Sequence, residues 1–234
     1  MTAIAVTIAG SDSSGGAGIQ ADLKTFAALG VYGASIITAL TAQNTKGVSS
    51  IADIAQDFIQ AQFDAVFSDL QVGAVKIGML SKYETIETVA ASLERYKQTK
   101  IVLDPVMVAT SGDRLLKPDA IDALKRVLIP RAILITPNLP EAAALLEQPI
   151  AIDENAMRGQ AERLIAAGAQ AVAAGRPAGR PGRGRLAARS VGRAGRSRWP
   201  GHAGLLLGGA GRQPGAGARK AGGAGREAVP AVPR

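Results

Sequence analysis

The sequence contains no cysteine among its 234 residues, and aromatic residues make up only 3% of it. The absence of cysteine excludes disulfide bonds and thiolate metal sites, and it is compatible with a reducing compartment. Residues 1–10 carry no basic segment, and no apolar run approaches the ~18 residues that a membrane-spanning helix needs. We therefore expect a cytoplasmic protein that has no membrane partner.

The positive charge of the chain is confined to its C-terminal part. Residues 173–234 hold 13 Lys and Arg but one acidic residue, a net charge of +12, which leaves −4 for residues 1–172. A basic region of this kind makes a non-catalytic nucleic-acid-binding protein an alternative reading. Trp199 is the one aromatic residue of the region, which weakens recognition by base stacking. We therefore expect no nucleic-acid partner.

The same C-terminal region has an unusual composition. Gly, Ala, Arg and Pro supply 48 of the 62 residues in 173–234, and no strand or helix period is sustained there. Codons for these four amino acids begin with two G or C bases, so their joint excess is what a GC-rich gene yields in the wrong reading frame. We interpret 173–234 as a frameshifted, disordered tail. A natural low-complexity basic tail remains the alternative.

Residues 1–172 alternate short apolar runs with longer helical patterns, as βαβ units around a mostly parallel sheet do. Asp153 is placed to cap a helix, and Gly30 and Gly168 stand where glycines end helices. We predict one α/β domain. Its expected strands are 3–9, 32–41, 74–78, 100–106 and 132–137, and its expected helices are 19–29, 54–70, 83–97, 118–127, 139–147 and 153–167.

A glycine-rich segment, residues 10–18, joins the first expected strand to the first expected helix. Such a turn lets backbone approach a ligand closely and can point free N–H groups and the helix dipole at it. The spacing matches neither a P-loop nor a dinucleotide-binding fingerprint. The loop is therefore either a ligand cradle of another kind or a structural turn.

Polar residues follow several strands at the edge where α/β proteins bind ligands. Asp22 and Gln43 have the chemistry to pair with the amino group and ring edge of a base, although a first-turn acid and a solvated loop residue explain them equally well. Asp104 and Glu141 supply hard oxygen ligands suited to Mg²⁺. Asn138 and Glu141 also have the spacing of a capping box, and both readings can hold together.

Five ordered motifs stand in residues 1–172: 9–24 (AGSDSSGGAGIQADLK), 41–45 (TAQNT), 76–80 (KIGML), 103–107 (LDPVM) and 136–141 (TPNLPE). Together they resemble the hydroxymethylpyrimidine/phosphomethylpyrimidine kinases of thiamine biosynthesis, which belong to the ribokinase-like superfamily. The resemblance implies a central, mostly parallel sheet flanked by helices. It also implies ATP-dependent phosphorylation of 4-amino-5-hydroxymethyl-2-methylpyrimidine and of its monophosphate, and it leaves a homodimer open. A pyridoxal or pyridoxamine kinase of the same superfamily is the nearest alternative.

The resemblance also implies roles for single residues. Asp22 and Gln43 would bind the pyrimidine, and Asp104 and Glu141 would hold Mg²⁺. The remaining implied residues are Gly10 and Gly18 in the substrate loop, Met79 and Val106 against the ring, and Asn138 beside the phosphates of ATP.

The chain departs from the family after residue 172. The family continues through a strand resembling Ala-Val-Leu-Val-Lys, whereas residues 171–175 read Ala-Val-Ala-Ala-Gly, so the lysine and the strands after it are not expected. The family's Gly-Thr-Gly-Cys turn, which supplies an anion hole, cannot occur in a chain without cysteine. Catalytic residues therefore remain unassigned. Because phosphoryl transfer depends on such preorganised charge, we expect no appreciable kinase activity from the chain as written.

Overall fold

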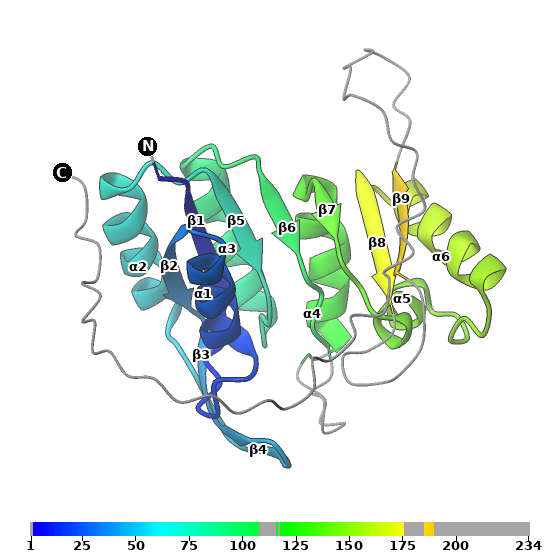
Figure 1. The fold of residues 1–234 in the computed structure, drawn as a ribbon, viewed down its shortest axis with the longest axis horizontal. Coiled ribbons are helices and arrows are strands. Elements are labelled where there is room, and N and C mark those ends of the chain that lie inside the picture. The colour runs from blue at the N-terminus through cyan, green and yellow to red at the C-terminus, as the bar shows by residue number, and fades with distance from the viewer. Residues whose placement is uncertain (1, 108–115, 117, 176–184, 190–234) are drawn as a thin grey trace, which may run out of the picture.

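The structure is a computed structural model that describes residues 2–107, 116, 118–175 and 185–189. Seven of the described strands form one sheet in the order β2-β1-β5-β6-β7-β8-β9 (Figure 1). All neighbouring pairs are parallel except β8 and β9. The predicted mostly parallel sheet is therefore confirmed. Its strands are β1 (Ile4–Ala9), β2 (Tyr32–Ile37), β5 (Ala74–Ile77), β6 (Ile101–Leu103), β7 (Leu134–Ile135), β8 (Ala171–Gly175) and β9 (Arg185–Arg189).

Each predicted helix is present close to its expected position. The Asp153 side chain accepts a hydrogen bond from the Ala156 N–H at 2.8 Å, as a helix N-cap does. Gly30 and Gly168 follow their helices with φ of 70° and 118°. The helices are α1 (Gly18–Ala28), α2 (Gln56–Asp69), α3 (Tyr83–Arg95), α4 (Pro118–Ala123), α5 (Leu139–Leu146) and α6 (Glu154–Ala166), and α4 continues into a π-turn (Leu124–Leu128) and a 3-10 turn (Ile129–Arg131).

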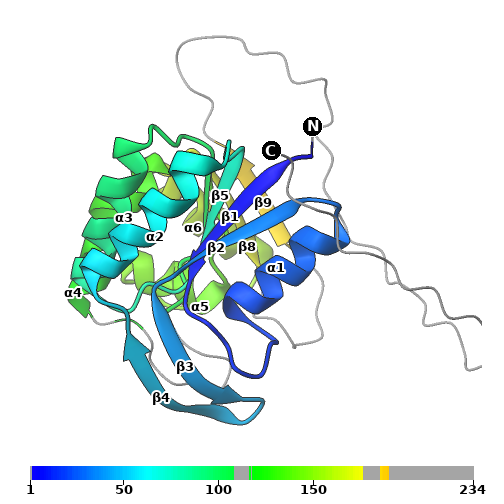
Figure 2. The ribbon, with the colours of Figure 1, turned by 90° about the vertical axis from the view of Figure 1, so that its left-hand side faces the viewer.

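The two faces of the sheet are covered unequally. Figure 2 shows α1 on one face of β1 and β2 and shows α2, α3 and α4 on the other. In β5 and β6, Val75, Ile77, Ile101 and Leu103 are buried, while the alternating Lys76 is only half-buried. The apolar core therefore lies on the side of α2–α4. Among the described residues, no helix is long and apolar enough to cross a membrane.

The single strand predicted over 32–41 is wrong in its second half. The chain leaves the main sheet at Thr38, whose N–H donates to the Ala9 carbonyl at 3.0 Å. It then forms an antiparallel hairpin of β3 (Ala39–Asn44) and β4 (Gly47–Asp53), which projects beyond the main sheet (Figure 2). Asn44 closes its turn by accepting from the Lys46 N–H at 2.8 Å. Mostly exposed residues in β4 gave no apolar alternation to predict it.

The expectation that no strand follows Val172 is wrong for two segments. β8 runs on to Gly175, and β9 pairs with it in antiparallel register from Ala171↔Arg189 to Gly175↔Arg185. Strand pairing uses backbone groups, so a composition poor in large apolar residues does not prevent it. The remaining residues of the expected disordered tail, 176–184 and 190–234, lie outside the described part. The domain division at residue 172 stays a prediction.

Candidate functional site

The candidate site lies on the sheet face that carries α1. The parallel register sets Thr7 of β1 beside Lys76 of β5, and Lys76 beside Val102 of β6. Alternation along β5 turns the Lys76 side chain away from the buried Val75 and Ile77. A charged residue in the middle of the sheet therefore faces α1.

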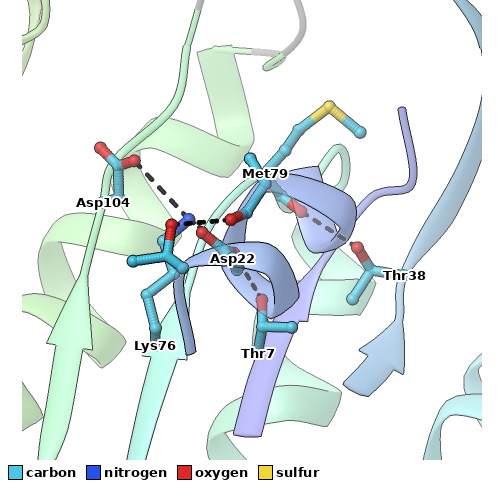
Figure 3. A network of polar contacts seen from close by, with 8 residues as sticks. Thr7, Asp22, Thr38, Lys76, Met79 and Asp104 are labelled. Atoms are coloured by element: carbon cyan, nitrogen blue, oxygen red, sulfur yellow. Dashed lines mark hydrogen bonds and ion pairs between the residues drawn. The ribbon is translucent and has the colours of Figure 1, made fainter. Parts of the chain in front are cut away.

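Asp22 of α1 meets this row of side chains (Figure 3). Its Oδ2 accepts a hydrogen bond from Thr7 Oγ1 at 2.6 Å and one from Lys76 Nζ at 3.0 Å. Lys76 Nζ also lies 3.7 Å from Asp104 Oδ2, just beyond the end of β6. The structure thus links Asp22 and Asp104, which the sequence analysis assigned to different ligands, through one ammonium group.

Asp104 in turn lies close to Glu141 at the start of α5. Burial raises the pKa of Asp104, as does the charge of Asp22, against the lowering effect of Lys76. Burial likewise raises the pKa of Glu141 to about 7, and the charge of Asp104 adds to this shift against the hydrogen bonds from Asn138 and Met107. A half-buried acid, Asp104, and a buried acid, Glu141, therefore repel each other here.

The predicted capping box at α5 is confirmed. The Asn138 N–H donates to Glu141 Oε2 at 2.8 Å, and the Glu141 N–H donates to Asn138 Oδ1 at 2.9 Å. Asp104 and Glu141 fit Mg²⁺, because they are hard oxygen donors whose repulsion a divalent cation would offset. Within the described residues, no three His, Cys, Asp or Glu side chains gather as a metal site. Among the described residues, a metal site here would therefore rest on two carboxylates, those of Asp104 and Glu141.

Three N–H groups of the glycine-rich loop, those of Ser14, Gly16 and Ala17, are bonded within the loop and are not free for a ligand. The carboxylate of Asp12, a residue that is 3% exposed, lies where a ligand would otherwise accept from these N–H groups. Its Oδ2 accepts from the N–H groups of Gly16 and Ala17 at 2.9 and 2.8 Å, and its Oδ1 accepts from the Ser14 N–H and Oγ at 2.8 and 2.7 Å. Burial opposes ionisation, but these hydrogen bonds hold the pKa of Asp12 below its usual value. The loop is therefore closed on itself.

Gly10 and Gly18 lie where the two ends of this loop touch. The Ile19 N–H donates to the Gly10 carbonyl at 3.0 Å. Gly18 has a φ of 55°, and a Cβ there would overlap the Gly10 carbonyl oxygen. A Cβ on Gly10 would lie 2.6 Å from Met79 Cε. Gly18 thus has a structural reason to be glycine, whereas a shift of the Met79 side chain could admit a Cβ at Gly10. Contact of both glycines with substrate stays a prediction.

Gln43 reaches the site region through the hairpin. Its N–H donates to Ser13 Oγ at 2.8 Å, and Ser13 Oγ donates to the Gln43 carbonyl at 2.7 Å. Its side-chain Oε1 accepts from Thr41 Oγ1 at 3.2 Å. Met79 is 8% exposed, and its carbonyl accepts from Thr38 Oγ1 at 3.0 Å (Figure 3). These bonds tie the hairpin to the first loop and to the chain after β5.

Three residues of the site region were missed in the sequence analysis: Thr7, Asp12 and Lys76. Lys76 carried a readable signal, because it is the one charged residue in the strand Ala-Val-Lys-Ile. A charge in a strand that is otherwise apolar requires a partner. Thr7 and Asp12 gave no comparable signal, since their partners are fixed by the folded loop and sheet.

Comparisons with known proteins identify relatives of this chain. The sequence profile of the phosphomethylpyrimidine kinase family matches residues 12–178. A hydroxymethylpyrimidine/phosphomethylpyrimidine kinase of Rhizobium meliloti is 61% identical over 172 residues, which are 74% of this chain and 64% of that protein. The chain thus spans less than two thirds of that relative.

Solved structures of two related kinases also resemble this chain. The crystal structure of a phosphomethylpyrimidine kinase from Clostridium difficile superposes with a TM-score of 0.73 at 43% identity, covering 81% of this chain and 82% of that one. An ADP complex of Bacillus subtilis pyridoxal kinase gives 0.71 at 34% identity, covering 81% and 76%. The extent and identity of these matches show that the chain belongs to the phosphomethylpyrimidine kinase family.

Proposed function

We propose that this chain forms the acceptor-binding and metal-binding part of an ATP-dependent kinase for 4-amino-5-hydroxymethyl-2-methylpyrimidine and its monophosphate. The observation that carries the proposal is the Asp22 carboxylate, held by Thr7 at 2.6 Å and Lys76 at 3.0 Å while its side chain keeps 17% of its surface exposed. A fixed carboxylate acceptor of this kind suits the exocyclic amino group of an aminopyrimidine. Gln43 would pair with the ring edge, and Met79 and Val106 would contact its faces.

Asp104 and Glu141 would hold Mg²⁺ beside this acceptor site, and Asn138 would lie next to the phosphates of ATP. When bound, Mg²⁺ would offset the negative charge of the transferring phosphoryl group. Asp22 and Gln43 would orient the acceptor so that its hydroxymethyl group faces that phosphoryl group. Met79 and Val106 would exclude water from the faces of the ring. Orientation of this kind is a large part of the rate enhancement in phosphoryl transfer.

The pyridoxal kinase alternative is less well supported. The pyridoxal kinase structure is 34% identical to this chain, whereas the pyrimidine kinase structure is 43% identical and the curated pyrimidine kinase is 61% identical. Binding of nucleic acid was considered because of the charge of 173–234, most of which lies outside the described residues. Cytoplasmic location, a homodimer and the absence of nucleic acid stay predictions.

Titration calorimetry with the aminopyrimidine tests the proposal. Asp22→Ala and Gln43→Ala should each weaken binding by about 1 to 3 kcal/mol, the cost of leaving a polar partner unpaired. Asp57→Ala is the matched control, because Asp57 is an exposed acid in the first turn of α2. Unchanged affinity in both site variants, or equal affinity for pyridoxal and the aminopyrimidine in the wild type, would contradict the proposal.

The kinase activity of the chain as written is a separate expectation. Product formation from ATP, Mg²⁺ and the aminopyrimidine should be undetectable or far below that of a chain whose reading frame is restored after residue 172. Removal of one preorganised donor typically costs about 100-fold in rate. Turnover within about tenfold of the frame-restored protein would contradict this expectation.

A further inference from the structure

Lys76 lies between two carboxylates that the proposed function assigns to different ligands. Its Nζ is 3.0 Å from Asp22 Oδ2 and 3.7 Å from Asp104 Oδ2, and its side chain is 24% exposed. Asp22 comes from α1 and Asp104 follows β6, so three separate segments meet at one ammonium group (Figure 3).

The position of the Lys76 ammonium group is built into the fold. Lys76 pairs in register with Thr7 on one side and Val102 on the other, which fixes its backbone in the sheet. A Cβ on Gly78 would lie 2.9 Å from Nζ, so glycine at that position leaves the space that the ammonium group occupies. Partial burial of a charge is costly unless it is paired, and here it is paired twice.

We propose that Lys76 is a positioning residue that orients the Asp22 carboxylate for the acceptor and acts as the counter-ion of Asp104 until a divalent cation binds there. This inference rests on the proposed function, because it takes Asp22 as the acceptor contact and Asp104 as a metal ligand. Lys76 acts through these two carboxylates and needs no contact with the substrate itself.

The two tasks predict effects of opposite sign when the ammonium group is removed. Asp22 loses one of its donors and retains Thr7, so its carboxylate is less well oriented and the pyrimidine binds more weakly. Asp104 loses a positive neighbour, so an incoming cation no longer meets like-charge repulsion and binds more tightly. General damage to the site would weaken the binding of both the pyrimidine and the cation.

The test uses the full chain and compares the wild type with Lys76→Met, which keeps the length of the side chain. Lys125→Met is the matched control, because Lys125 Nζ is paired with Glu147 Oε1 at 2.8 Å outside the site. Calorimetry measures the Kd of the aminopyrimidine in metal-free buffer and, in a separate titration, the Kd of Mg²⁺ alone. We expect the pyrimidine Kd of Lys76→Met to rise about tenfold, the scale of one lost charge-assisted hydrogen bond. Its Mg²⁺ Kd should fall, and both should stay unchanged in Lys125→Met.

Circular dichroism checks that the variants fold, and Lys76→Gln replaces Lys76→Met if the latter does not. In an Asp22→Ala background, Lys76→Met should cause no further loss of pyrimidine affinity, because its effect passes through Asp22. If the wild type binds the pyrimidine, then unchanged affinities, a weaker Mg²⁺ affinity or an additive double variant would overturn the inference on Lys76 alone. A wild type that does not bind the pyrimidine would overturn the proposed function with it.

Discussion

Removal of the Asp12 carboxylate should destabilise the protein far more than its place in a glycine-rich loop suggests. The carboxylate is 3% exposed and accepts four hydrogen bonds, from Ser14 N–H and Oγ, Gly16 N–H and Ala17 N–H. A hydrogen bond to a charged group contributes about 1.5 to 3 kcal/mol, but the freed donors regain water, so the four do not add. We expect Asp12→Ala to lower the free energy of unfolding by about 2 kcal/mol.

Urea unfolding measures this change. Asp57→Ala is the control, because Asp57 is exposed and accepts from the N–H of its chain neighbour Phe58 at 2.8 Å. The pH dependence gives a second reading. Because the folded state lowers the pKa of Asp12, its stabilisation is present above the usual Asp pKa and is lost as the pH falls through the folded value. Asp12→Ala should therefore lose less stability in acid than the wild type. If Asp12→Ala lowers the free energy of unfolding by no more than Asp57→Ala does, the reasoning is refuted.

Three further predictions concern other parts of the fold. In the presence of a chelator, Glu141→Gln should be more stable than the wild type at pH 8 by about 2 kcal/mol. The fold raises the pKa of Glu141 from 4.5 to about 7, so the ionised side chain lowers the stability of the wild type as the pH rises through that window. Equal stability of the two proteins at pH 8 would contradict this. Thermal unfolding should show that Gly18→Ala destabilises the protein by about 2 kcal/mol or more. Gly159→Ala should instead stabilise it by roughly 0.5 to 1 kcal/mol, because Gly159 lies within α6 and a Cβ there meets nothing within 4 Å. Hydrogen exchange should show slow amides in 171–175 and 185–189 because β8 and β9 pair there, and fast exchange in both segments would refute that pairing.

The sequence predicted the features that short stretches of chain determine. Asp153 caps α6 through an N–H only three residues away, and Asn138 and Glu141 form their capping box across the same spacing. The strand and helix order followed from apolar periodicity for the same reason. Local chemistry decides these elements, and it is fully visible in the sequence.

The features that were missed depend on contacts between distant segments. Lys76 and Asp22 are 54 residues apart, and their ion pair exists because α1 packs on β1, which pairs with β5 in the folded sheet. The closed state of the Gly10–Gly18 loop depends on positive φ at Gly15 and Gly18, which brings N–H groups to Asp12. The hairpin of β3 and β4 consists largely of exposed residues, so burial left no pattern to read.

The central claim is that Asp22 binds the amino group of an aminopyrimidine while Lys76 holds Asp22 beside Asp104. A crystal structure of the chain with 4-amino-5-hydroxymethyl-2-methylpyrimidine tests it most directly. We predict the amino group within hydrogen-bonding distance of the Asp22 carboxylate, with Lys76 Nζ still between Asp22 and Asp104. A pyrimidine bound elsewhere, or an Asp22 carboxylate turned away from it, would contradict the account.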